Sequence, residues 1–153
     1  MGHLVTIVLA TVGAVLGCVD TYVLLQGRRV RLRVVPKSAV RDTGGVWSNS
    51  MRHMPGGAPC IEVVNLSAFP VTICEVGYEL PSPMRATIIE PTLLDSKRWP
   101  RRLEPREAVT VYGDSAALPP NIGRAFARTD CGVIRFGGSP ALDDLKRRLR
   151  GRT

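Results

Sequence analysis

The chain has 153 residues, 44% of them hydrophobic and 22% charged, and this composition excludes an intrinsically disordered protein. Fifteen glycines and twelve prolines favour a turn-rich, mainly β domain of about 100 to 130 residues with an appendage. The net charge of +8 predicts attraction to anionic surfaces, either phospholipid headgroups or nucleic acid.

The first predicted element is an apolar run from Leu4 to Leu25, in which Asp20 is the only charged side chain. As a helix these 22 residues are about 33 Å long, enough for a hydrocarbon core of about 30 Å. Asp20 costs up to about 3 kcal/mol of insertion free energy, which the Leu, Ile and Val residues of the run outweigh. The run therefore predicts a transmembrane helix within residues 1–27.

The segment Val15-Leu16-Gly17-Cys18 resembles the lipobox of a bacterial lipoprotein, which offers another interpretation. Two features oppose cleavage: residues 1–3 contain no Lys or Arg, and apolar residues resume at 22–25, beyond the cut. We therefore expect an uncleaved span. The alternatives are an exported lipoprotein or envelope module lipidated at Cys18, and a phage-type structural protein whose N-terminal helix packs on other subunits.

Positive charge gathers on one side of the run, at Arg28, Arg29, Arg31, Arg33 and Lys37. Because the side richer in Lys and Arg stays cytoplasmic, we expect a bacterial inner-membrane protein with its N-terminus out and its domain in the cytoplasm. Each of these cations adds about 1 kcal/mol of attraction to an anionic leaflet. Arg28, Arg29 and Arg31 are thus candidate lipid-surface or partner-binding residues.

Gly13, Gly17 and Asp20 lie on nearly one face of the predicted helix. Small residues allow close helix approach and a polar group can bond across it, so this face is a candidate helix–helix contact in a homodimer. The alternative is that glycine is simply frequent in membrane helices.

Short strands separated by turns are predicted for residues 28–138. Six or seven such strands suggest an antiparallel β-sandwich of immunoglobulin-like type, although the Cys…Trp…Cys hallmark is missing. Residues 41–58 are predicted to form a long loop. The predicted strands span 31–35, 60–65, 70–78, 85–90, 108–112, 125–128 and 133–136.

The strands at 60–65 and 70–78 are predicted to pair as a hairpin, with Ile61, Val63, Val71 and Ile73 facing the core. If Ile61 lies opposite Ile73, then Cys60 and Cys74 are neighbours on the outer face. They would stay thiols in the cytoplasm and could be bridged in an oxidising compartment.

A helix is predicted at the end of the chain, within residues 139–153. Ser139 is a favourable N-cap, Pro140 suits the first helical position, and Leu142, Leu145 and Leu149 share one face. The helix ends in cations, which the dipole at its C-terminus favours. It either caps the sandwich or lies with this basic end on a membrane surface.

No catalytic, cofactor-binding or metal-binding motif is present, so we expect a protein that binds rather than catalyses, without a cofactor. The strongest binding candidates are clustered at Lys97, Arg98, Trp99, Arg101 and Arg102. Cations around a tryptophan suit lipid headgroups or a single-stranded nucleic acid, but the usual nucleic-acid modules are absent. The alternative is a solvated loop with the Trp99 ring held against the sandwich.

Two stretches, EVVNLSAFPVTICEVGYEL and LEPREAVTVYGD, resemble a theme found in uncharacterised small bacterial single-pass membrane proteins with an immunoglobulin-like domain. The theme is a V-x-N-x-G/S-x-x-P-V-T-I strand pair followed by an L-x-P-G-E turn, and here Arg106 replaces the usual glycine. The resemblance covers about residues 28–138 and implies a fold but no activity. We therefore expect a membrane-anchored binding or scaffold module, whose partners are anionic lipid and another protein.

Overall fold

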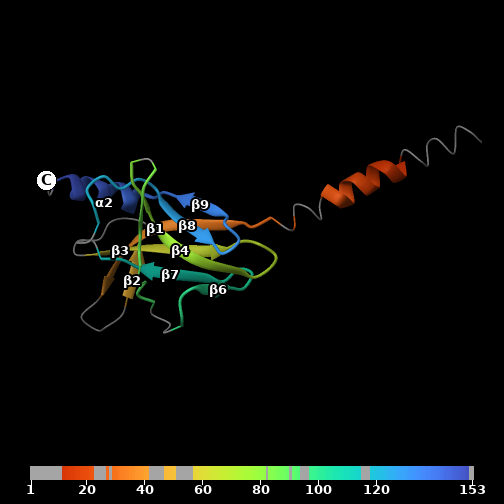
Figure 1. The fold of residues 1–153 in the computed structure, drawn as a ribbon. Coiled ribbons are helices and arrows are strands. Elements are labelled where there is room, and N and C mark those ends of the chain that lie inside the picture. The colour runs from red at the N-terminus through yellow and green to blue at the C-terminus, as the bar shows by residue number, and fades with distance from the viewer. Residues whose placement is uncertain are drawn as a thin grey trace, which may run out of the picture.

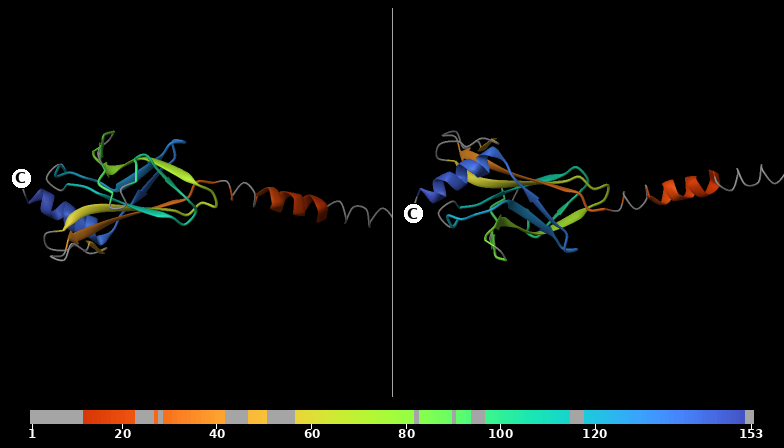
Figure 2. Two further views of the ribbon diagram at one scale, coloured as in Figure 1. Left: turned by 90° about the horizontal axis from the view of Figure 1, so that it is seen from below. Right: turned by 90° about the horizontal axis from the view of Figure 1, so that it is seen from above.

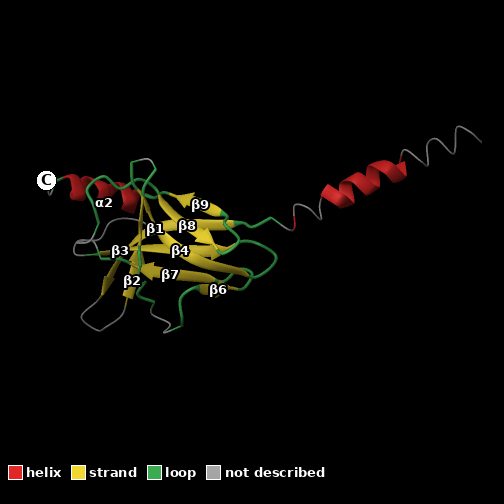
Figure 3. Ribbon diagram, viewed as in Figure 1, coloured by secondary structure: helices red, strands yellow, loops and turns green. Residues whose placement is uncertain are grey.

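The computed structural model describes residues 12–22, 27, 29–41, 47–50, 57–81, 83–89, 91–93, 97–114 and 118–151. In this part of the chain the protein is mainly β, with two antiparallel sheets and two helices (Figures 1 and 3). The predicted class, mainly β with antiparallel sheets, is confirmed.

The two sheets pack face to face, and all hydrogen-bonded strand pairs among the described residues are antiparallel. The first sheet has the order β2-β1-β3-β7, formed by β2 (Trp47–Ser50), β1 (Leu32–Arg41), β3 (Ala58–Asn65) and β7 (Ala108–Tyr112). The second has the order β5-β4-β8-β9, formed by β5 (Arg85–Thr87), β4 (Val71–Glu79), β8 (Ala125–Thr129) and β9 (Ile134–Gly137). A further short strand, β6 (Arg101–Leu103), pairs with the beginning of β4.

Strand β1 is longer than predicted, because it continues through Pro36. Proline is tolerated there since β2 pairs with β1 only from Ser38 onward, so β1 has an open edge at Pro36. The prediction of a continuous loop over residues 41–58 is wrong in part, because β2 lies inside it. The predicted strand over 85–90 is shortened to β5.

The predicted hairpin over residues 60–76 is wrong. Strand β3 pairs with β1 and β7, whereas β4 belongs to the other sheet. The chain therefore crosses from one sheet to the other between Asn65 and Val71. Cys60 lies opposite Lys37 and Tyr112, so it is not a cross-strand neighbour of Cys74.

The side chains predicted to face the core do so, although they come from facing sheets. Ile61, Val63 and Ile73 are 0% exposed and Val71 is 5% exposed. Burying each of them contributes about 1.5–3 kcal/mol to the free energy of unfolding. The two sheets come into close contact at Gly137, where a Cβ atom would lie 1.8 Å from the Val34 carbonyl oxygen of β1.

A bulge interrupts β4 at Cys74, where the pairing with β8 shifts register between Ile73 and Glu75. The extra residue leaves a backbone carbonyl outside the ladder, and the indole Nε1 of Trp99 donates a hydrogen bond to it at 3.2 Å. The inward alternation then resumes at Val76 and Tyr78. Trp99 therefore stabilises the bulge.

The predicted C-terminal helix is confirmed as α2 (Pro140–Arg150). Ser139 caps it, since its Oγ accepts a hydrogen bond from the Leu142 amide at 3.3 Å and donates one to the Pro36 carbonyl at 2.5 Å. Leu142 and Leu149 are buried in the main core. Helix α2 thus packs on the sandwich.

The N-terminal helix of residues 12–22 stands apart from the sandwich, and the C-terminus lies at the opposite end of the domain (Figures 1 and 2). All eleven of its residues are exposed. Residues 1–11 and 23–26 of the predicted transmembrane helix lie outside the described residues, and so does Arg28, which follows it. No helix in the described part of the chain is both long and apolar enough to cross a membrane.

Candidate functional site

The end of the sandwich from which the N-terminal segment departs is rich in arginine. Arg29 and Arg31 are exposed just before β1 begins, and Arg33 is exposed within it. Two loops join the sheets at this end, the β3–β4 loop of residues 66–70 and the β6–β7 turn of residues 104–107. Both loops are held in place by one buried side chain.

That side chain is Asn65, at the end of β3, which is 0% exposed. Its Nδ2 donates to the carbonyl oxygens of Phe69 at 2.9 Å and Leu103 at 3.0 Å, and its Oδ1 accepts from the Ser67 amide at 2.9 Å. Ser67 in turn accepts a hydrogen bond from the Arg31 amide at 2.9 Å through its Oγ. Asn65 therefore ties the loops to each other and to the start of β1.

The β6–β7 turn is closed by Glu107. Its carboxylate accepts hydrogen bonds from the Glu104 amide at 2.8 Å and from Arg101 Nη2 at 2.7 Å. The Glu104 amide, and then the Arg101 and Lys97 cations, hold the pKa of Glu107 below its usual value of 4.5. Arg106 at the tip has a φ of +68°, a conformation that favours glycine, and its amide donates to the Asn65 carbonyl at 2.8 Å.

A pocket of about 380 Å³ opens between these segments. Its lining includes Arg29 and Arg31 together with Arg106, which is more than 70 residues away in the sequence. The pocket is lined by Gly27, Arg29, Arg31, Leu66, Ser67, Ala68, Pro105 and Arg106. We call it the basic pocket.

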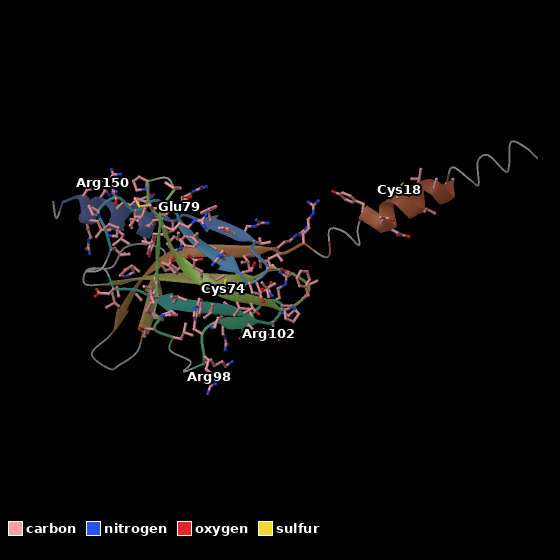
Figure 4. The ribbon with its side chains drawn as sticks, in the orientation of Figure 1. Cys18, Cys74, Glu79, Arg98, Arg102 and Arg150 are labelled. Atoms are coloured by element: carbon pink, nitrogen blue, oxygen red, sulfur yellow. The ribbon has the colours of Figure 1, made fainter. Side chains whose placement is uncertain are left out.

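The predicted cluster at residues 97–102 divides into two groups. Arg101 is 8% exposed and engaged by Glu107, and Trp99 is half-buried against the core, as the structural alternative for this segment expected. Lys97, Arg98 and Arg102 are exposed, and Figure 4 shows the last two on one side of the domain. The lipid or partner binding predicted for these three side chains stays a prediction.

The cations of α2 gather at the other end of the domain. Figure 4 places Arg150 at one end of the molecule and Cys18 of the N-terminal helix at the other. The core contacts of Leu142 and Leu149 agree with the capping interpretation of α2.

The four cysteines are free and differ in exposure. Cys60 is fully buried, and burial raises the pKa of its thiol to about 11, so it is not a nucleophile near neutral pH. Cys74 is half-buried and donates a hydrogen bond to the Arg128 carbonyl at 3.4 Å, and Cys131 is exposed in the β8–β9 turn. Within the described residues, no His, Cys, Asp and Glu side chains are grouped to hold a metal ion.

Comparison of the chain with protein-family models, with curated proteins and with solved structures finds no match. The candidate site is therefore described by its geometry alone. The sequence prediction found Arg29 and Arg31 but missed Arg106, whose position beside them depends on the crossing of the chain between the sheets.

Proposed function

We propose that the chain is a single-pass membrane protein whose β-sandwich acts as a binding or scaffold module without enzymatic activity. The observation that carries this proposal is the exposure of the N-terminal helix. Val12, Val15, Leu16, Val19 and Tyr22 are each 51–62% exposed, and nothing in the described part of the sandwich covers them. A continuous apolar surface of this kind needs an apolar environment, and the hydrocarbon core of a membrane provides one.

The orientation follows from the arginines between this helix and β1. The proposed topology places the N-terminus outside and the sandwich in the cytoplasm of a bacterium, with Arg29 and Arg31 against the inner leaflet. The apolar residues that resume at 22–25, after Cys18, support a membrane anchor over a lipoprotein signal, because a chain cut before Cys18 has no evident use for them. Anionic lipid and a protein partner are the proposed ligands.

The sandwich is proposed to be immunoglobulin-like. The order β1-β3-β7 in one sheet and β5-β4-β8-β9 in the other follows the A-B-E and C′-C-F-G order of those domains. Two features differ: β2 is added outside β1, and β6 pairs with β4. Strands β2 and β6 both lie at the edges of their sheets, so the order of the central strands is unchanged.

The helix also has a face suited to self-association. Cβ atoms built on Gly13 and Gly17 meet no other heavy atom within 4 Å, so this face is open. Asp20 is exposed one turn further along. We propose that two copies can pair through this face within the membrane.

The test of anchoring and topology uses the full chain with a reporter fused after Thr153. A reporter that is active only in the cytoplasm should be active in this fusion. The protein should be released from membranes by non-ionic detergent but not by high salt. An impermeant thiol reagent should fail to label Cys131 in intact cells and should label it after permeabilisation. A mature protein that begins at Cys18, or quantitative recovery in buffer without detergent, would overturn the proposal.

A further inference from the structure

We propose that the basic pocket binds the phosphate group of an anionic phospholipid headgroup. The proposal rests on the membrane anchoring proposed above and adds a defined ligand class and a defined site to it. It differs from a general basic surface because it depends on Arg106, a residue from a different loop.

Two cations of the pocket, Arg29 and Arg106, are not neutralised by described acids. Glu104 and Glu107 flank Arg106 in the turn, but Glu104 pairs with Arg102 at 3.3 Å and Glu107 with Arg101 at 2.7 Å. In the part of the chain that the structure describes, neither Arg29 nor Arg106 has an acidic partner. Guanidinium groups bind phosphate oxygens in a planar, bidentate manner, so a phosphate fits this set of donors.

Backbone hydrogen bonds hold Arg106 and Arg31 in place. The Arg106 amide donates to the Asn65 carbonyl at 2.8 Å, and the Arg31 amide donates to Ser67 Oγ at 2.9 Å. Both contacts lead to Asn65, the first to its backbone carbonyl and the second, through Ser67, to its side chain. Backbone segments that are ordered before binding reduce the conformational entropy lost when a ligand is bound.

The position of the pocket identifies the source of the phosphate. Its wall includes Gly27, two residues beyond Leu25, where the apolar run ends. Two residues span at most about 7 Å, which is roughly the thickness of one headgroup layer. A pocket at this depth lies within reach of the lipid headgroups of the same leaflet.

The test compares two double variants of the full chain with equal loss of charge. Arg29→Ala/Arg106→Gly removes the two pocket cations, and glycine suits the φ of +68° at position 106, so the fold is retained. The control, Arg148→Ala/Arg150→Ala, removes two exposed cations of α2 that do not line the pocket. Binding of dioctanoylphosphatidic acid is measured by native mass spectrometry of protein released from non-ionic detergent, with dioctanoylphosphatidylcholine and inorganic phosphate as comparison ligands.

We expect about tenfold weaker binding of phosphatidic acid by the pocket variant and a change within about twofold for the control. Equal weakening in both variants would overturn the pocket assignment, as would equal binding of phosphatidylcholine by the unaltered chain. Binding of inorganic phosphate as tight as that of phosphatidic acid would overturn the lipid source. Membrane fractionation separates the two proposals, because a chain that stays with membranes but binds lipid independently of Arg29 and Arg106 contradicts only the pocket.

Discussion

Replacing Asn65 by alanine should destabilise the domain more than any exposed polar substitution. The side chain of Asn65 is fully buried and bonds to Phe69, Leu103 and Ser67. Alanine keeps the strand conformation but removes both the donor and the acceptor, and water has no access to replace them. The backbone groups that lose their partner then remain buried without one.

The magnitude follows from the number of groups affected. The bonds to the Leu103 carbonyl and from the Ser67 amide are both buried. Each unsatisfied buried group costs about 1–3 kcal/mol, so we expect the free energy of unfolding to fall by roughly 2–6 kcal/mol. With a urea m-value of about 2 kcal/mol/M, the midpoint of unfolding should fall by roughly 1–3 M.

The assay is urea unfolding of the full chain in non-ionic detergent, followed by circular dichroism and tryptophan fluorescence. Asn121→Ala is the matched control, because Asn121 is exposed and its loss should change the free energy of unfolding by less than about 0.5 kcal/mol. A decrease of less than about 1 kcal/mol for Asn65→Ala, at an unchanged m-value, would show that the two loops do not depend on this side chain.

Three further predictions concern the sheet contact, an ion pair and a thiol. Gly137→Ala should lower the free energy of unfolding by at least about 2 kcal/mol, because the new Cβ would overlap the Val34 carbonyl, whereas Gly138→Ala meets no atom within 4 Å and should be nearly neutral; equal effects in urea unfolding would contradict this. Glu107→Gln should destabilise most at neutral pH: the folded-state pKa of Glu107 is lowered from 4.5, so its stabilisation is present above that pH and is lost as the pH falls through the folded value. Unfolding curves of both proteins from pH 7 to 3 should therefore converge, and a constant difference would refute this role. Maleimide at pH 7 should modify Cys131 in the native chain but Cys60 only in denaturant, as read by peptide mass spectrometry, and similar rates at both thiols would contradict the burial of Cys60.

The elements that are defined by local chemistry could be predicted from the sequence. Ser139 and Pro140 fix the start of α2 by capping and by a preset φ, and neither depends on distant residues. The β8–β9 hairpin follows from two apolar segments around the turn that contains Gly132, whose φ is +84°. Strand β7 was predicted with its observed bounds, Ala108–Tyr112.

The partner of each strand could not be predicted in the same way. Alternating apolar residues mark one buried face, and the pattern is the same whether the next strand is a neighbour or lies in the facing sheet. The segment between Asn65 and Val71 is short enough for a hairpin. What directs it across the sandwich is the side chain of Asn65, which bonds to the Leu103 carbonyl 38 residues later and to Ser67 and Phe69 within the loop. The prediction that Cys60 and Cys74 are cross-strand neighbours is wrong because β3 and β4 lie in different sheets.

Several polar and aromatic side chains of the two quoted stretches and of the 97–102 cluster stabilise the fold. Asn65 and Glu107, which belong to the two quoted stretches, join the loops at the arginine-rich end. Trp99 completes the bulge in β4, and Arg101 is buried against Glu107. Arg106 differs from these residues, because it is exposed and no described acid neutralises it. It occupies a backbone conformation that disfavours every residue except glycine, Asn and Asp, and it faces the basic pocket. At this position arginine costs about 1 kcal/mol of folding free energy relative to glycine, and the proposed phosphate contact would offset that cost.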